Sequence, residues 1–335
     1  MGNRTGNIPD ISRLIRGLLD ANYERIVSPV LRSIAANHTT GAMKTRMDQL
    51  EAELARLAEA GEKLQIDNPV LAAWFESFEA TLERDRELIN SIAAQLQAGG
   101  IDAAEKLTPQ ITFNGLPASV RAAWNMPDPE AVAAAVDFVN KPAWGQELTK
   151  INANTLGVSR NVVIRGIATG RPPLATAADL RRLNAELTVA QARTITRTGY
   201  LASYRQAAAI NQLENSNILE KQIRVAVLDE RTCMACVIQN GDVLEIGEVV
   251  KDHQSGRCTS VAIVKGYPRT IQSGQAWFEK LPESQQRSMM GQQAFDDWSD
   301  GKFSLRDFIH PYRDDVFGEM VRQASLKEIY LKKGY

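Results

Sequence analysis

The sequence predicts a mainly α-helical protein that also contains a small β-sheet, an α+β fold. Apolar residues recur at helical spacing over long stretches, and an Asn-Gly pair between apolar residues near position 240 is typical of a β-hairpin. All three cysteines fall within 26 consecutive residues. We therefore expect an N-terminal hairpin of long helices, followed by a mixed helical domain in which cysteine and histidine side chains staple a hairpin.

Length and composition limit the number of domains and the classes of protein that the sequence can represent. The 335 residues are enough for two or more domains, and the formal net charge of −1 argues against a basic protein that coats nucleic acid. No run of about 18 apolar residues occurs, so no membrane span is expected. An odd number of cysteines does not make a disulfide framework, which favours assembly in a reducing cytoplasm.

The first of four expected regions is a helical arm over residues 1–98. Residues 10–36 carry an apolar stripe at helical spacing, and residues 43–64 and 71–96 repeat apolar residues in alternating steps of three and four. Asp67-Asn68-Pro69 lies between the last two stretches and is typical of the start of a helix. These two stretches are expected to form an antiparallel hairpin with coiled-coil packing.

The second expected region is a linker with short helices over residues 99–142. Its first part, residues 99–130, holds four of the thirteen prolines and three glycines, which are the residues that most often interrupt regular structure. The domain that carries the cysteines is then expected over residues 143–265. The last region, residues 266–335, reads as polar and helical with aromatic anchors.

Within the third region, a long helix is predicted from about Val189 to Leu213. Thr188 and Gln191 have the spacing of a capping box at its start. Arg193 and Arg197 lie four residues apart and share one face. Such a pair can meet an acidic partner, a backbone phosphate or only water.

Strands are predicted on both sides of the cysteines. Residues 223–228 alternate in hydropathy, residues 259–264 form a short apolar run, and Asn240-Gly241 is predicted to turn a hairpin between them. The strands would form a small sheet that packs on the helices.

The cysteines and one histidine have the spacing of metal ligands. Cys233 and Cys236 form a Cys-x-x-Cys pair, and His253 and Cys258 follow after sixteen further residues. Two such pairs can supply four ligands to a tetrahedral zinc ion. A buried cluster of reduced thiols is the alternative interpretation.

The stretch from residue 223 to 241, IRVAVLDERTCMACVIQNG, resembles the signature of the phage Mu protein F-like minor head proteins, as does ARTITRTGYLASYRQAA at 192–208. The matching motif residues are Asp229, Arg231, Thr232, Cys233, Cys236 and Gly241. The end of the motif differs, because Gly256 stands where the family usually has a cysteine. The resemblance covers about residues 144–263, with a weaker likeness beyond.

This resemblance implies a structural, non-enzymatic minor head protein of a tailed bacteriophage. Its expected partner is the portal protein, with capsid or scaffold protein and packaged DNA as further partners. Its expected place is the head interior near the portal, after assembly in the host cytoplasm, where it would assist head assembly, genome packaging or ejection. Asp229, Arg231, Thr232, Gly241, Arg193 and Arg197 are the candidates for structural or partner anchoring, and Arg231 beside the cysteines is expected to bond within the loop.

Two other classes of function remain open from the sequence. A prophage-type toxin or zinc-dependent enzyme could use Cys233 or Cys236 as a nucleophile with His253 as its base. A DNA-binding zinc module would need a basic stripe, and residues 193–231 are only mildly positive. No phosphate-binding glycine loop or hydrolase motif occurs, so no catalytic residue is assigned.

Overall fold

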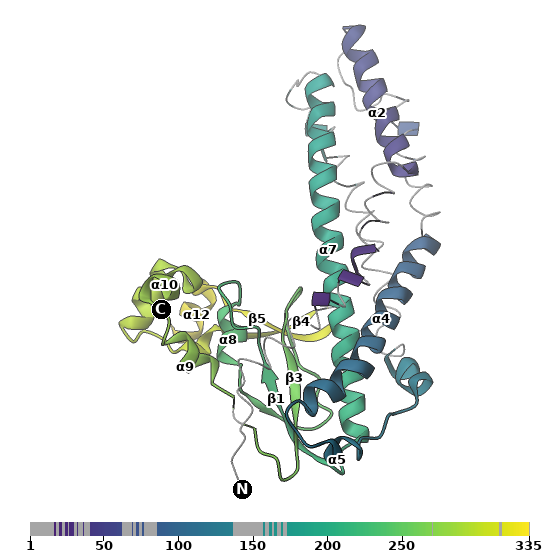
Figure 1. Ribbon diagram of the computed structural model, residues 1–335. Coiled ribbons are helices and arrows are strands. Elements are labelled where there is room, and N and C mark those ends of the chain that lie inside the picture. Colours follow the sequence, from purple (N-terminus) through teal and green to yellow (C-terminus); the bar gives the residue numbers. More distant parts are fainter. Residues whose placement is uncertain are drawn as a thin grey trace. The chain divides into compact units, whose positions relative to one another are not determined.

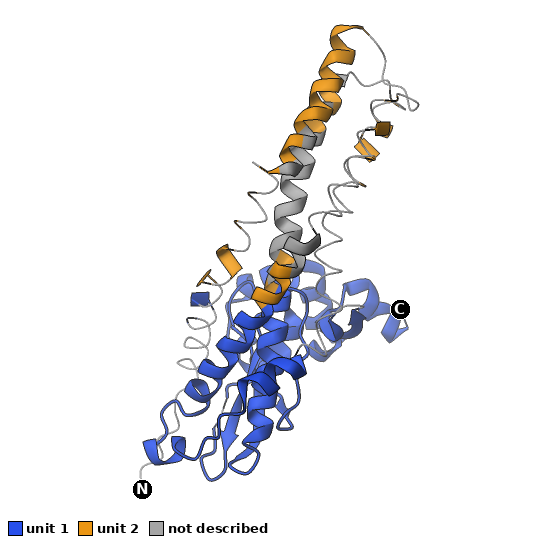
Figure 2. Cartoon of the chain, turned by 90° about the vertical axis from the view of Figure 1, so that its right-hand side faces the viewer, with its two compact units in different colours: residues 1–23, 97–140, 198–335 blue, residues 24–96, 141–197 orange. Residues whose placement is uncertain are grey.

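The computed structural model describes residues 41–61, 86–136, 173–269, 271–314 and 317–334, together with isolated residues within 17–36, 69–76 and 157–169. Figure 1 labels most of their helices and strands. The chain divides into two compact units (Figure 2): unit 1 comprises residues 1–23, 97–140 and 198–335, and unit 2 comprises residues 24–96 and 141–197. The predicted fold class is confirmed, since helices predominate and the sheets are small and antiparallel.

Helix α2 (Ala42–Glu59) in unit 2 follows the predicted spacing. Leu50, Leu54 and Leu57, which alternate by four and three residues, are all buried. Apart from isolated positions, the predicted helix over residues 10–36 and residues 62–85 of the predicted hairpin lie outside the described residues.

The predicted linker over residues 99–142 is wrong in its first part. Helix α4 (Arg86–Thr112) runs through Gly99 and Gly100 and includes Pro109 in its last turn. A Cβ on Gly100 would lie 2.6 Å from the carbonyl oxygen of Tyr200, so this glycine allows two helices to approach closely. The glycine is therefore a packing feature and not a break. Short helical segments, α5 (Ala118–Arg121) and residues 129–136, do follow.

Helix α7 (Pro173–Glu214) is longer than the predicted helix of residues 189–213. It starts at Pro173, where proline is favoured because its fixed φ suits the first turn and its missing N–H would have no partner there. The capping box predicted at Thr188 is therefore wrong, since that residue lies inside the helix. In unit 1, Tyr200 and Tyr204 of this helix are buried, whereas Leu213 near its end is 56% exposed.

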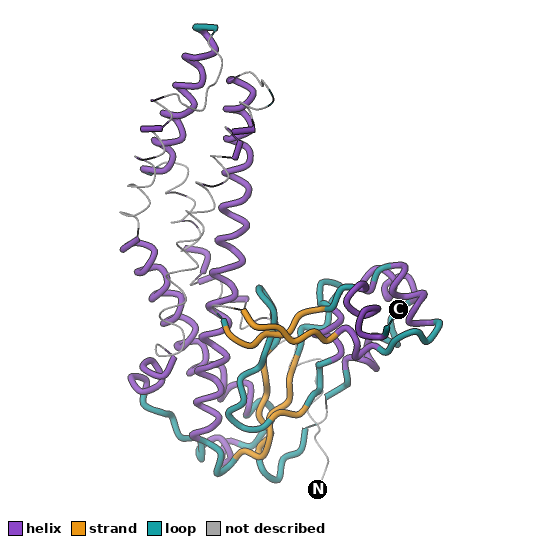
Figure 3. Tube along the Cα trace, turned by 180° about the vertical axis from the view of Figure 1, so that it is seen from behind, coloured by secondary structure: helices purple, strands orange, loops and turns teal. Residues whose placement is uncertain are grey.

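A three-stranded antiparallel sheet lies next in the chain (Figures 1 and 3), with strand order β2-β1-β3. Strand β1 (Leu219–Val225) pairs on one side with β2 (Val243–Leu244) and on the other with β3 (Thr259–Val264). The predicted strand over residues 259–264 is confirmed, and β1 lies a few residues earlier than predicted.

The hairpin predicted at Asn240-Gly241 is wrong. The residues before it form a short helix, α8 (Met234–Ile238), which is buried throughout. Only Gly241 of the pair has a positive φ, +97°, whereas a two-residue turn of this sequence type needs both. The pair instead ends the helix, and the backbone N–H of Gly241 donates to the Arg224 carbonyl at 2.9 Å, which brings β2 beside β1.

The C-terminal region of unit 1 contains a β-hairpin that the sequence did not reveal. Its elements are α9 (Gly274–Phe278), α10 (Glu283–Met290), α11 (Gln292–Ser299), the 3₁₀ helix η1 (Leu305–Phe308), β4 (Ile309–Asp314), β5 (Gly318–Gln323) and α12 (Leu326–Lys333). Strands β4 and β5 pair over six residue pairs. Their half-buried polar residues hide the alternation that marks a strand.

Helix α8 and the C-terminal region share one hydrophobic core. Met234, Val237 and Ile238 of the helix pack in a cluster with aromatic residues such as Phe278 and Phe308. Gln323 of β5 accepts a hydrogen bond from the backbone N–H of Met234 at 2.7 Å. The C-terminal region is therefore continuous with the unit that carries the cysteines, which differs from the predicted boundary at residue 265.

Candidate metal centre

The four predicted ligands come from three places in unit 1. Cys233 is the N-cap of α8 and Cys236 lies within that helix. His253 lies in the loop between β2 and β3, and Cys258 directly precedes β3. The sheet brings these places together, because β2 and β3 both pair with β1.

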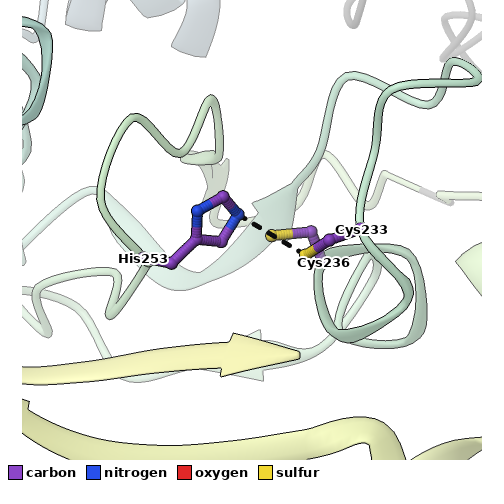
Figure 4. Close-up of side chains that lie close together, drawn as sticks. All are labelled: Cys233, Cys236 and His253. Carbon is purple, nitrogen blue, oxygen red and sulfur yellow. Dashed lines mark hydrogen bonds between the residues drawn. The ribbon is translucent and has the colours of Figure 1, made fainter. Parts of the chain in front are cut away.

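The structure brings all four predicted residues into one cluster. The ligand atoms of Cys233, Cys236 and His253 lie within 4.8 Å of one another, and those of Cys236, Asp252 and Cys258 do the same. The Cys233 sulfur is 3.4 Å from Nε2 of His253, and Figure 4 shows the two sulfurs of the Cys-x-x-Cys pair and the imidazole facing each other. Cys236 belongs to both groups and is the centre of the cluster.

The imidazole of His253 is oriented by its backbone surroundings. Its Nδ1 lies 2.8 Å from the carbonyl oxygen of Gln254. A carbonyl can only accept a hydrogen bond, so Nδ1 carries the proton and Nε2 presents its lone pair to the sulfurs. This is the arrangement that a histidine needs to bind a metal through Nε2.

Asp252 is the member of the cluster that sequence analysis missed. Its carboxylate is fully buried; it accepts hydrogen bonds from Arg205 at 2.7 Å and from the backbone N–H groups of Cys258 and His253 at 2.9 Å each. Arg224 lies 3.6 Å away. Burial raises the pKa of Asp252, but the charges of the two arginines outweigh it and the pKa lies below its ordinary value.

The thiols differ in their tendency to ionise. The pKa of Cys236 is raised well above its ordinary value, first by its hydrogen bond to Cys233 and also by burial. The pKa of Cys258 is also raised well above its ordinary value, through its hydrogen bond to Cys236 and its burial. Cys233 accepts the bond from Cys236 and is only half-buried, and its pKa is lowered. Without a metal, Cys233 is thus the first of the three to become a thiolate.

A second set of hydrogen bonds closes the loop around the cluster. The guanidinium of Arg257 binds the carboxylate of Asp229 through two hydrogen bonds of 2.7 and 2.6 Å. The hydroxyl of Thr232 shares its one proton between the same carboxylate, at 2.9 Å, and the carbonyl of Val227. Because Asp229 precedes Cys233 and Arg257 precedes Cys258, this clasp joins the two halves of the cluster.

The side chain of Arg231 does not form the hydrogen bonds within the loop that were expected of it. Its side chain is 81% exposed and approaches Asp229 only to 3.7 Å, although its backbone N–H does donate to that carboxylate at 3.1 Å. The internal role falls to Arg257. Of the other two arginine candidates, Arg197 is half-buried in α7, and the side chain of Arg193 lies outside the described residues.

Gly256 has no room for a side chain. A Cβ at this position would lie 2.2 Å from an oxygen of Asp252, and Arg205 binds the Gly256 carbonyl at 2.9 Å. The resembling family usually has a cysteine at this position. In this chain the Asp252 carboxylate fills the space that such a side chain would need. Asp252 and Gly256 therefore depend on each other.

The chemistry of the cluster is that of a metal site made of sulfur and nitrogen. Three sulfurs and one imidazole nitrogen are the donors that tetrahedral zinc sites use, and four protein ligands leave no open position for a substrate. Cys236 and Cys258 are almost completely buried, while the side chain of His253 is 29% exposed.

Comparisons with protein-family models, with curated proteins and with solved structures found no match for this chain. Within the described part of the chain, no helix has the length and apolar character that crossing a lipid bilayer requires.

Proposed function

We propose that the cluster holds one zinc ion as a structural staple, with Cys233, Cys236, His253 and Cys258 as its ligands. The convergence of these donors from α8, the β2–β3 loop and the start of β3 supports the proposal. Asp252 fits less well as a ligand, because both of its oxygens already accept hydrogen bonds from buried donors. A bound zinc would join the three segments and contribute directly to folding.

We further propose that the chain is a structural minor head protein of a tailed bacteriophage that binds the portal inside the head. The observation that supports this proposal is that five of the six matching motif residues, all except Arg231, serve the cluster or the helix that carries it. Asp229 and Thr232 form the clasp, the cysteines form the cluster, and Gly241 ends α8. In this proposal the protein acts by binding, and capsid or scaffold protein and the packaged DNA are its further neighbours.

The competing proposal is a toxin or zinc-dependent enzyme. One observation favours it: Cys233 has a lowered pKa and lies 3.4 Å from His253, as a nucleophile and its base would. A zinc ion bound to both residues would remove them from such chemistry. Zinc content therefore separates the zinc staple from an enzyme that uses Cys233 as its nucleophile, whereas a zinc-dependent enzyme would also contain zinc.

Metal analysis of the purified chain tests the zinc site. We expect about one zinc per chain in the native protein and roughly a tenth or less in Cys236→Ser, since this sulfur belongs to both groups of donors. Ser284→Ala in α10, remote from the cysteines in sequence, is the control and should retain the native zinc content. Absence of zinc from the native protein would leave a cluster of reduced thiols; it would exclude a zinc-dependent enzyme and favour one that uses Cys233 as its nucleophile.

Co-expression with the portal protein of the same phage, followed by size-exclusion chromatography, tests the partner. We expect co-elution at micromolar concentration, and a specific contact of this kind buries upwards of about 1,000 Å². Separate elution would remove the portal proposal. In that case, toxicity in the host that is lost in Cys233→Ala would identify the enzyme.

A further inference from the structure

Two buried arginines lie beside the thiols with only one carboxylate between them. The side chains of Arg205 and Arg224 are 6% and 4% exposed, and that of Asp252 is fully buried. Among the ion pairs of the described residues, neither arginine has another acidic partner. Two guanidinium groups and one carboxylate carry a net charge of +1, and an uncompensated charge in a protein interior is strongly unfavourable.

The two arginines face different neighbours. All hydrogen bonds of Arg205 reach oxygen atoms, those of Asp252, Gly256 and Cys258. Arg224 donates to the Lys251 carbonyl, and its other terminal nitrogen lies 3.9 Å from the sulfur of Cys236. Its Nε is buried and has no hydrogen-bond partner. Arg205 therefore shapes the loop, whereas Arg224 places its charge near both the sulfur of Cys236 and the carboxylate of Asp252.

We propose that Arg224 is the counter-charge of a metal–thiolate centre and sets its affinity for divalent metal; this inference rests on the proposed zinc site. Three thiolates, one neutral imidazole and one divalent cation sum to −1. The arginine–aspartate–arginine group contributes +1, so the buried assembly is neutral when it contains a divalent metal. Without metal, the charge of +1 is uncompensated whenever all three thiols are protonated.

The same sum predicts the kind of metal. A monovalent ion such as Cu⁺ on three thiolates would leave the assembly at −1, whereas Zn²⁺, Co²⁺ or Cd²⁺ brings it to zero. A ligand set with only two thiolates would leave it positive with a divalent ion. The charge of Arg224 therefore favours a divalent ion bound by all three cysteines.

Competition between the full-length chain and a chromophoric zinc chelator tests the proposal. Arg224→Met removes the charge and keeps much of the volume, and Arg224→Lys keeps the charge. We expect the zinc dissociation constant to rise about tenfold or more in Arg224→Met, as for outer-shell partners of metal ligands, and to stay closer to the native value in Arg224→Lys. Arg306→Met, which removes an exposed arginine paired with Asp242, is the matched control and should bind zinc like the native chain.

A second measurement separates charge compensation from a merely structural role. Zinc should raise the melting temperature of Arg224→Met less than that of the native protein, because the neutral metal-free form of the variant no longer contains the unbalanced charge. A structural role alone would lower both melting temperatures and leave their difference unchanged. If Arg224→Met does not fold, the zinc affinity of Arg224→Lys still tests the inference. Loss of zinc binding in Arg224→Lys, which keeps the positive charge, would overturn it.

The outcomes distinguish this inference from the proposed function. Equal zinc affinity in the native chain and Arg224→Met, or equal weakening in the methionine and lysine variants, overturns the counter-charge role and leaves the zinc site standing. A native chain that binds no divalent metal overturns both.

Discussion

At the scale of single residues, the loop around the cysteines is held by charge-assisted hydrogen bonds. Asp229 accepts two of them from Arg257 and a third from the hydroxyl of Thr232. Burial raises the pKa of Asp229, but these donors outweigh it and lower the pKa to about 2. The ionised carboxylate is therefore the form that the folded protein stabilises.

Asp229→Asn is expected to destabilise the folded protein by roughly 1.5–3 kcal/mol, the usual contribution of a hydrogen bond to a charged group. Urea unfolding at neutral pH measures this difference, and Arg231→Ala is the control from the same loop. Because the side chain of Arg231 is 81% exposed, its removal should change stability by less than about 0.5 kcal/mol. Equal effects of the two substitutions would contradict the assignment of the clasp to Arg257.

The stability difference caused by Asp229→Asn is also expected to depend on pH. The folded-state pKa of Asp229 is below the unfolded value of about 3.9, so its contribution is fully present above pH about 4 and is lost as the pH falls towards about 2. The stability difference between the native chain and Asp229→Asn should shrink over this window. Loss of the proposed zinc at low pH would affect both proteins, and the difference between them therefore isolates the clasp.

The sequence could predict which cysteine and histidine residues cluster but not the groups that surround them. Cysteine is rare in this chain, so the grouping of Cys233, Cys236 and Cys258 stands out, and their spacing is itself the signal. Arg205, Arg224 and Asp252 come from α7, β1 and the loop before β3. Nothing in the spacing of an arginine and an aspartate distant in sequence marks them as partners, because the sheet decides which residues meet.

At the scale of helices and strands, Gly100 serves the packing of two helices, whereas local sequence rules predict that a glycine pair interrupts a helix. Gly99-Gly100 and the prolines that follow predicted a break, but α4 continues to Thr112. The cost of glycine in a helix, about 1 kcal/mol, is offset by the packing it allows against Tyr200 and Tyr204 of α7. Such a contact between distant segments cannot be read from the local sequence.

Gly100→Ala is therefore expected to destabilise the protein by about 1–3 kcal/mol, although alanine is the better helix former. The added Cβ would lie 2.6 Å from the Tyr200 carbonyl oxygen, which belongs to the backbone and cannot move away alone. Gln110→Ala, at an exposed position of the same helix, should be close to neutral. Thermal unfolding of the two variants makes the comparison, and a stabilised Gly100→Ala would show that the helices do not pack in this way.

At the scale of the whole molecule, α8 connects the cysteine cluster to the C-terminal region of unit 1. Cys236 on this helix packs with Ala226, Val250 and Cys258, while Met234 and Val237 pack in the core with Phe278. One short helix thus contributes to both clusters. We expect the cysteine cluster and the C-terminal core to unfold together as one cooperative unit.

Phe278→Ala tests this coupling. Phe278 is completely buried, and its truncation is expected to cost about 3–5 kcal/mol. Because α8 would lose part of its support, zinc should leave the protein at the same lowered denaturant concentration at which Trp277 and Trp298, both in this core, become exposed. Parallel urea titrations read by tryptophan fluorescence and by a zinc-responsive dye measure the two events. Leu331→Ala, at a 66% exposed position on α12, should leave both transitions in place. Retention of zinc after the fluorescence transition is complete would show that the cluster folds independently, and that the boundary predicted near residue 265 separates two cooperative units after all.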